Sequence, residues 1–161
     1  MITGVNHLSF TVSDVEKSAE FYKDVLGLKL MDICERDKDF SEKVTGIKTA
    51  RLKIAYLEAV NCSLELVQYL CPPAQKIDTR TCNVGSAHIC FNVSDFHQKL
   101  GRLREDGVHF AGSPCVIPAG PNKGKMVLYF EDPDSNTIEI ISNERLVQPL
   151  GVFQAEQGKV M

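Results

Sequence analysis

The chain repeats a short segment of itself, and this repeat limits the possible folds more than any other feature. The pattern G-x-x-H-x-x-F-x-V-S-D occurs at residues 4–14 and again at residues 85–95. Six of the eleven positions are fixed identities, and every matching position is offset by 81 residues, about half of the 161-residue chain. Self-similarity at this spacing predicts two copies of one structural unit in tandem.

Each copy is expected to begin with a strand and to continue into an amphipathic helix. Ser13 and Ser94 are the expected N-caps, because each stands directly before a run with helical spacing of apolar residues. Gly27 and Gly107 are expected to end the two helices. The apolar faces are Val15, Ala19, Tyr22 and Leu26 in the first helix, and Phe96, Leu100 and Leu103 in the second.

Three strand-like runs follow the helix in each copy, so each copy is predicted to be a βαβββ module. Residues 132–136 read D-P-D-S-N and predict a tight turn between the last two runs of the second copy. Residues 37–46 and 114–123 are expected to be loops that determine pocket specificity. The strand-like runs are residues 28–34, 50–57 and 63–69 in the first copy, and residues 108–111, 125–130 and 137–142 in the second.

The predicted organisation is therefore α+β. The first βαβββ module spans residues 1–70 and the second spans residues 85–143. A linker at residues 71–84, which opens with Cys-Pro-Pro, joins them, and residues 144–161 form a C-terminal tail. Hydrophobic residues make up 43% of the chain, which is enough for a sizeable core.

Charge and composition exclude several kinds of partner. The formal net charge is −3, and no block of Lys or Arg is present to bind phosphate backbones, so nucleic acid is not expected. The first residues lack the pattern of a secretory signal, and no apolar run is long enough to span a bilayer. A cytoplasmic location is expected, with the six cysteines kept as reduced thiols and Cys90 acting as a small hydrophobic residue in a strand.

Two histidines and two glutamates occupy matching places in the two copies. His7 and His88 lie on the first strand of each copy, and Glu65 and Glu139 lie on the last strand between Leu or Ile residues. Because side chains alternate along a strand, each histidine is expected to face away from the helix. Two buried carboxylates without a cation would be costly. The four residues therefore predict a site for one divalent ion, such as zinc, nickel, cobalt, manganese or iron.

His97 and His109 have no such symmetry and are expected to be ordinary polar residues.

The chain resembles the vicinal oxygen chelate superfamily, which includes glyoxalase I, methylmalonyl-CoA epimerase, extradiol dioxygenases and the fosfomycin- and bleomycin-resistance proteins. The resemblance covers roughly residues 4–143 and is closest in ligand set to glyoxalase I and the epimerase. It implies two βαβββ modules that form a curved, mainly antiparallel eight-stranded sheet around a metal held by His7, Glu65, His88 and Glu139. The motifs that carry it are HLSFTVSD (7–14), FYKDVLG (21–27), LEL (64–66), AHICF (87–91) and FEDPDSNTIE (130–139).

The same resemblance implies a metal-dependent lyase or isomerase that transfers a proton beside the carbonyl of a small substrate or thioester. Glu139, with Glu65 as the alternative, is the expected base, and Tyr129 and Lys125 are weaker candidates for substrate contacts. Four protein ligands leave at most two positions on an octahedral ion for substrate oxygens or water.

Two other functions stay open at this point. One is a ferrous ring-cleaving dioxygenase that uses His7, His88 and Glu139 as ligands. The other is a drug-binding resistance protein. A homodimer is expected, because a curved sheet leaves edges that need cover. The metal cup can then lie within one chain or be shared between two.

Overall fold

The structure, a computed structural model, describes residues 1–146. Two βαβββ modules follow one another along the chain, so the predicted α+β class with tandem modules is confirmed. The elements are β1 (His7–Thr11), α1 (Val15–Asp24), β2 (Lys29–Arg36), α2 (Lys38–Thr45), β3 (Arg51–Ala59), β4 (Cys62–Cys71), β5 (His88–Val93), α3 (Phe96–Glu105), β6 (Cys115–Val116), β7 (Lys125–Glu131) and β8 (Thr137–Arg145).

Each module forms its own four-stranded sheet. The strand order is β1-β4-β3-β2 in the first sheet and β5-β8-β7-β6 in the second. The first and last strands of a module are parallel, and the remaining neighbours are antiparallel. The sequence repeat thus produces one topology twice, and within one chain the eight strands lie in two sheets, with β1 and β5 at free edges.

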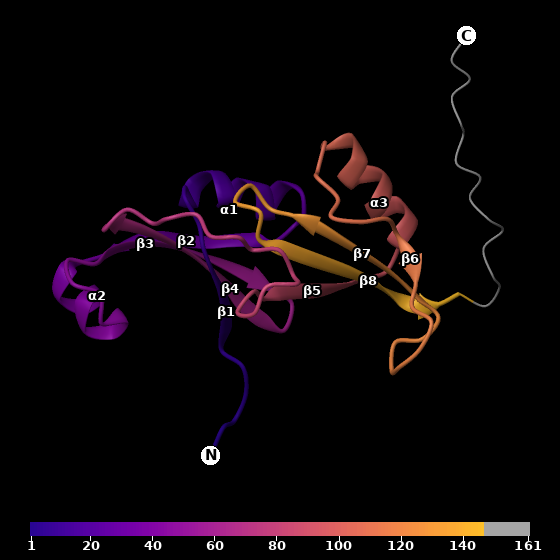
Figure 1. The fold of residues 1–161 in the computed structure, drawn as a ribbon, viewed down its shortest axis with the longest axis horizontal. Coiled ribbons are helices and arrows are strands. Elements are labelled where there is room, and N and C mark those ends of the chain that lie inside the picture. Colours follow the sequence, from indigo (N-terminus) through magenta and orange to yellow (C-terminus); the bar gives the residue numbers. More distant parts are fainter. Residues whose placement is uncertain (147–161) are drawn as a thin grey trace, which may run out of the picture.

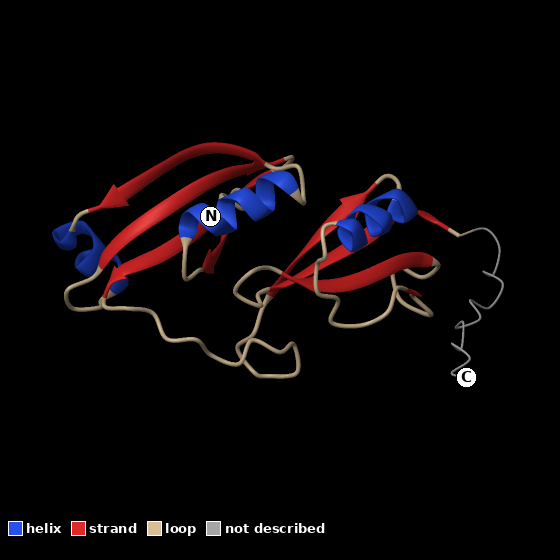
Figure 2. Ribbon diagram, turned by 90° about the horizontal axis from the view of Figure 1, so that it is seen from above, coloured by secondary structure: helices blue, strands red, loops and turns tan. Residues whose placement is uncertain are grey.

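The two modules lie side by side along the long axis of the molecule (Figure 2). Helices α1 and α3 cover the same side of the two sheets, which is the upper side in Figure 1. The short helix α2 lies at the outer end of the first sheet, far from the second module (Figure 1). The faces opposite α1 and α3 are therefore turned toward a common side.

The helices begin one residue later than the sequence pattern predicts. Asp14 is the N-cap of α1, and its carboxylate accepts a 3.0 Å hydrogen bond from the backbone N–H of Lys17. Asp95 caps α3 in the same way, at 2.8 Å from the N–H of Gln98. Ser13 and Ser94 were therefore wrong as N-caps, because the following aspartates hold the extended backbone and the acceptor that an N-cap needs.

Two segments differ from the prediction. Residues 38–45 form helix α2 instead of a loop, capped by Asp37 and ended by Gly46 at φ 71°. The apolar side chains of α2 are exposed. The helix was therefore missed, because it has no buried face that would give a periodic apolar pattern in the sequence. The predicted strand at 108–111 is reduced to one bridge between Phe110 and Phe130, and β6 begins only at Cys115. Gly112-Ser113-Pro114 interrupts the run, and proline cannot donate a ladder hydrogen bond.

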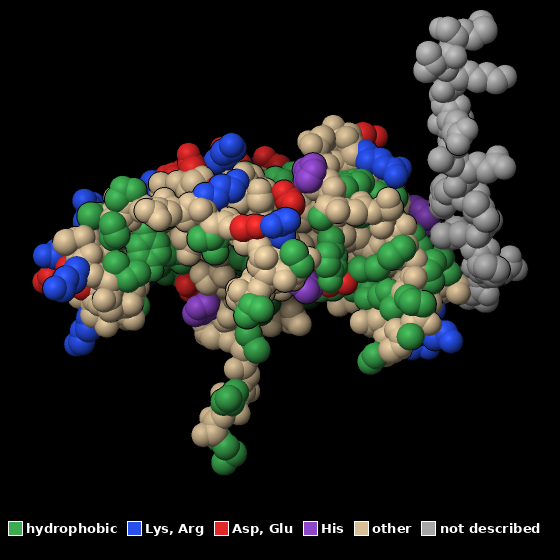
Figure 3. Space-filling model, viewed as in Figure 1, with side chains coloured by type: hydrophobic (Ala, Val, Ile, Leu, Met, Phe, Trp, Pro, Cys, Tyr) green, Lys and Arg blue, Asp and Glu red, His purple; other side chains and the backbone are tan. Residues whose placement is uncertain are grey.

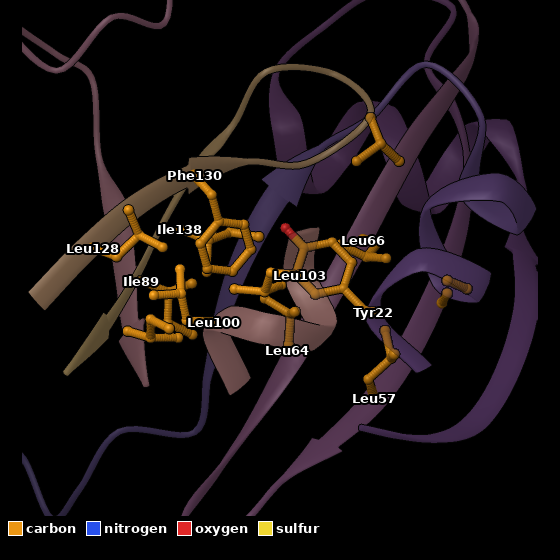
Figure 4. Packing of buried hydrophobic residues seen from close by; sticks show 14 of the residues in the cluster. Tyr22, Leu57, Leu64, Leu66, Ile89, Leu100, Leu103, Leu128, Phe130 and Ile138 are labelled. Atoms are coloured by element: carbon orange, nitrogen blue, oxygen red, sulfur yellow. The ribbon is translucent and has the colours of Figure 1, made fainter. Parts of the chain in front are cut away.

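One hydrophobic core connects the two modules (Figure 4). The apolar faces expected for the helices are buried, and Tyr22 and Leu103 are both fully inaccessible. The Tyr22 hydroxyl donates a 3.1 Å hydrogen bond to Asp132 in the β7–β8 turn of the other module. Burial, followed by the charge of Asp132, raises the pKa of Tyr22. This buried contact helps to hold the two modules in one orientation.

The C-terminal part of the chain is described only to residue 146. Strand β8 continues to Arg145, two residues into the segment expected to be a tail, and the rest of that tail, residues 147–161, lies outside the described residues. In residues 1–146, none of the helices has the length and apolar character needed to cross a membrane. On the face shown in Figure 3, positive and negative side chains are interspersed over both modules.

Candidate functional site

The second module brings His88 and Glu139 together. His88 begins β5, and Nε2 of its ring lies 3.1 Å from Oε2 of Glu139 on the neighbouring strand β8. The Glu139 side chain is only 14% exposed, whereas that of His88 is 36% exposed. The ring of Tyr129 lies with its centroid 5.1 Å from that of His88, and the two ring planes are tilted by 44°.

The first module brings His7 and Glu65 together in the equivalent place. His7 begins β1, and its Nδ1 lies 3.6 Å from Oε1 of Glu65 on β4. The same ring nitrogen is 2.9 Å from the side-chain oxygen of Asn6. The side chains of His7 and Glu65 are 42% and 19% exposed, so this pair is more open than the pair in the second module.

The chemistry and spacing of both pairs fit a metal ion. Two ligands about 2.1 Å from one ion, at angles of about 90° to 110°, lie roughly 3.0 to 3.4 Å apart. The two observed separations, 3.1 and 3.6 Å, lie in or close to that range. Among residues 1–146, neither glutamate forms an ion pair with Lys or Arg. A cation would therefore neutralise two largely covered carboxylates.

The structure assembles the four predicted ligands two by two, and one chain does not bring all four together. Within the described part of the chain, no group of three or more His, Cys, Asp or Glu side chains is close enough to hold an ion. Each pair lies on the sheet face opposite the helix of its own module. One chain therefore presents the four residues as two separate His/Glu pairs.

A tyrosine lies directly across from each candidate glutamate. In the antiparallel ladders Tyr56 on β3 is paired with Glu65, and Tyr129 on β7 is paired with Glu139. Residues that are directly opposite in a ladder share a face of the sheet. Burial, and then the charge of Glu139, raises the pKa of Tyr129, so its hydroxyl stays protonated at neutral pH.

Sequence reasoning named Tyr129 and missed Tyr56. The missed signal was the occurrence of a tyrosine in the third strand of both modules. Lys125, the other candidate for a substrate contact, begins β7 and is partly buried.

Cys90 lies on the same face as His88, two residues further along β5, and is paired with Glu139. Cys90 lies in a strand as expected, but alternation along β5 buries Ile89 and exposes Cys90, so the cysteine is not a buried hydrophobic residue. Partial burial of its sulfur, followed by the Glu139 charge, raises the pKa of the Cys90 thiol to about 12. All six cysteines are free thiols.

A pocket of about 730 Å³ opens at the junction of the modules, between β1, the linker and the β7–β8 turn. Ser9, Thr11 and Ala87 line it beside the strands that carry the histidines, but none of the four predicted ligands does. His97 is exposed, and His109 lies at the surface 3.3 Å from Glu131, in agreement with an ordinary polar role for both.

A known protein-family model matches most of the chain. The model of the "Glyoxalase/Bleomycin resistance protein/Dioxygenase superfamily" matches residues 4–140. This range includes the first module, the second module up to the first half of β8, and all four candidate ligands.

Curated relatives have several activities. A 2-epi-5-epi-valiolone epimerase from Actinomyces sp. is 29% identical over 96% of this chain and 93% of its own length. Metallothiol transferase FosB from Staphylococcus epidermidis is 33% identical, with 86% of this chain and 81% of its own length covered. Lactoylglutathione lyase from Neisseria meningitidis is 32% identical, with 86% and 89% covered.

Solved structures share the fold. A glyoxalase family protein from Bacillus cereus superposes with a TM-score of 0.73 at 20% identity, covering 88% of this chain and 95% of that chain. The fosfomycin resistance protein FosX from Listeria monocytogenes, in a complex with Mn(II) and sulfate, superposes with a TM-score of 0.61 at 18% identity, covering 89% and 95%.

Proposed function

Since the chain belongs to the glyoxalase/bleomycin resistance protein/dioxygenase superfamily, we propose that it is a divalent-metal-dependent lyase or isomerase that transfers a proton beside a carbonyl group. The observation that carries this proposal is the occurrence of two equivalent His/Glu pairs on the open faces of the two sheets. Relatives described as an epimerase and a lyase support the reaction class.

The proposed ligands are His7, Glu65, His88 and Glu139. Because one chain holds them as two separate pairs, the proposed centre forms between two copies. His7 and Glu65 of one protomer would face His88 of the partner subunit and Glu139 of the partner subunit. A two-fold axis would generate two identical centres in the dimer.

The edges of the two sheets support this assembly. β1 and β5 are edge strands, each paired on one side only. Exposed edge strands tend to pair with another chain unless they are covered. Val5, just before β1, is 70% exposed, and Leu8, within β1, is 42% exposed. A neighbouring copy would cover both side chains. Pairing of β1 with β5 of a second copy would join the sheets into the curved eight-stranded cup that the family resemblance implies.

In this cup a bound divalent cation would polarise a substrate carbonyl and stabilise the negative charge that develops beside it. Side chains of the protein then remove the proton and return it. The Glu139 carboxylate, with Glu65 as the alternative, removes a proton from the carbon beside the carbonyl and holds it on oxygen. Return of that proton to a neighbouring atom completes an isomerisation, and inversion at the carbon would need a second group, such as Glu65, to donate a proton from the opposite face. Tyr129 and Tyr56 are paired with the two glutamates in the ladders and share their face of each sheet, and their hydroxyls are proposed to donate hydrogen bonds to substrate oxygens.

The reaction class is tested by isotope exchange. The protein is incubated with Mn(II), Ni(II) or Zn(II) in heavy water together with a panel of 2-acyl thioesters and hemithioacetals. Deuterium is expected at the carbon next to the carbonyl, and Glu139→Gln should abolish its incorporation. A panel without exchange, together with oxygen-dependent opening of catechols, would overturn the proposal in favour of a ring-cleaving dioxygenase. Consumption of a thiol without exchange would favour a transferase, the activity named for the FosB relative.

The shared centre is tested by mixing His7→Ala and His88→Ala chains. In a random mixture of dimers, about one quarter of the centres combine an unaltered first module with an unaltered second module if the centre spans two copies. Isothermal titration with Mn(II) should then recover about a quarter of the wild-type stoichiometry, whereas each variant alone recovers none. A centre built within one chain gives no recovery, since every chain carries one altered ligand.

A further inference from the structure

The open face of the first module carries a fixed arginine that the metal chemistry does not use. Arg36 ends β2, and Nη2 of its guanidinium donates a 3.2 Å hydrogen bond to the hydroxyl of Tyr56. Tyr56 is paired with Glu65 in the β3–β4 ladder, so its ring is on the same face of the sheet as that carboxylate. The guanidinium therefore lies on the face that carries the candidate centre.

Arg36 is held in place at both its backbone and its side chain. Its backbone is paired with Leu52 in the β2–β3 ladder, and its carbonyl accepts a hydrogen bond from the hydroxyl of the buried Ser41 in α2. The side chain is oriented by Tyr56. A guanidinium that is oriented before binding loses little conformational entropy when a ligand docks.

The charge of Arg36 has no partner in an ion pair within residues 1–146. The nearby Asp32 is paired with Tyr56 across the β2–β3 ladder and is exposed. Asp32 forms no ion pair with Arg36. The neighbouring Arg51, in contrast, lies 3.2 Å from Glu35. Four of the five donor N–H groups of Arg36 are thus available, in a geometry that matches a carboxylate or a phosphate.

We propose that Arg36, oriented by Tyr56, is a specificity-determining residue that binds an oxyanion group of the substrate at the far end of the cup from the metal. This inference rests on the proposed function, since it assumes that the substrate is bound on the concave face. The length of a tyrosine side chain and one strand spacing place the guanidinium roughly 10 Å from Glu65. The substrate class is then a small compound with chelating oxygens at one end and a carboxylate or phosphate at the other.

The experiment uses synthetic chelators of graded length. Monohydroxamates of the six- and eight-carbon dicarboxylic acids are titrated into the Mn(II)-loaded protein, and each is compared with its terminal carboxamide. The wild-type protein should bind one carboxylate about tenfold more tightly than the matching amide, the gain typical of one charge-assisted pair. A matching terminal phosphonate distinguishes the two oxyanions by which of them binds more tightly.

Three variants separate the outcomes. Arg36→Met should abolish the preference for the charged tail and leave Mn(II) affinity unchanged, and Arg36→Lys should retain part of the preference. Arg51→Met removes one positive charge from the same region and should leave the preference intact. Circular dichroism checks that each variant is folded.

Equal affinity of the wild-type protein for charged and neutral tails would overturn the inference while leaving the proposed function standing. A preference that survives in Arg36→Met would overturn it as well. Absence of any hydroxamate binding to a metal-loaded protein would instead overturn the proposed function, and with it the subsite.

Discussion

The two modules have the same first and last strands but differ in the elements that lie between those strands in the sequence. The first and last strands have the same arrangement in both, and each carries one histidine and one glutamate at equivalent positions. Between them, the first module has an eight-residue β2, helix α2 and a nine-residue β3. The second module has a β6 of only two residues and, in the described chain, no helix between β6 and β7.

This difference indicates that metal binding and substrate selection depend on different parts of each module. The positions that repeat are those proposed to hold the metal, and the segments that diverge are those that shape the surroundings of the substrate. In the first module Arg36 and Tyr56 come from the diverged part, and their hydrogen bond has no counterpart at Tyr129 among the described residues. In the second module His88 is packed against Tyr129, whereas His7 contacts Asn6. We therefore expect the second module to hold its metal ligands more rigidly and the first to contribute more to selectivity.

Loss of one metal ligand should have the largest effect. Glu139→Gln and Glu65→Gln should each lower Mn(II) affinity by at least about 10- to 100-fold, a range already seen for changes outside the ligand shell. The larger loss is expected for Glu139, because its pair is closer and less exposed. Isothermal titration gives both values.

His109→Ala is the matched control for these variants, since His109 also forms a His/Glu pair but lies outside the proposed centre. Unchanged affinity in Glu65→Gln, together with loss in Glu139→Gln, would break the symmetry. It would indicate three protein ligands and favour the dioxygenase alternative.

Removal of the Tyr22–Asp132 hydrogen bond, which joins the two modules, should have an intermediate effect, and the effect should be on stability. The repeat places Leu103 at the position equivalent to Tyr22, so only the first helix has a hydroxyl that reaches the other module. Tyr22→Phe should lower the free energy of unfolding by about 2 kcal/mol, the value of a buried hydrogen bond to a charged group. Tyr69→Phe is the control, because the Tyr69 hydroxyl forms no hydrogen bond within residues 1–146. Urea denaturation at pH 7 measures both.

The Tyr22 contribution should also depend on pH. Folding raises the pKa of Tyr22, so the folded protein keeps the phenolic proton at a pH where the unfolded chain has lost it. The stabilisation is therefore complete below about pH 10, the ordinary value for tyrosine, and is lost as the pH rises toward the folded value. The difference in stability between wild type and Tyr22→Phe should shrink above about pH 10. A difference that stays constant to pH 11 would contradict this account.

The helix caps should give the smallest effect, equal in the two modules. Asp14→Ala and Asp95→Ala should each destabilise the protein by about 1 kcal/mol, since each removes one side-chain acceptor for a helix N–H. Ser13→Ala and Ser94→Ala should have little effect, because neither serine side chain is the cap. Thermal unfolding of the four variants compares the modules directly, and a larger effect of the serine variants would restore the capping scheme inferred from the sequence.

The sequence by itself determined the repeat, and with it the fold class, the order of the elements common to the two modules, and the buried faces of α1 and α3. These follow from local periodicity, because Val15, Ala19 and Tyr22 recur at helical spacing and the strands alternate. The same alternation placed each histidine on the face opposite the helix, whereas the separations of 3.6 and 3.1 Å from the glutamate of the same module were shown by the structure. Because the sequence repeats, the same pairing of first and last strands occurs in both modules.

Only the tertiary structure decided how the two modules meet. Tyr22 and Asp132 are 110 residues apart, and no local pattern signals their hydrogen bond. Packing of the two helical faces into one core sets the modules side by side and keeps the two His/Glu pairs apart in one chain. Helix α2 and the Arg36–Tyr56 contact were likewise missed, because an exposed apolar helix lacks a buried periodic face and a cross-strand contact depends on register. Local spacing specifies a module, whereas the relation between modules depends on long-range packing.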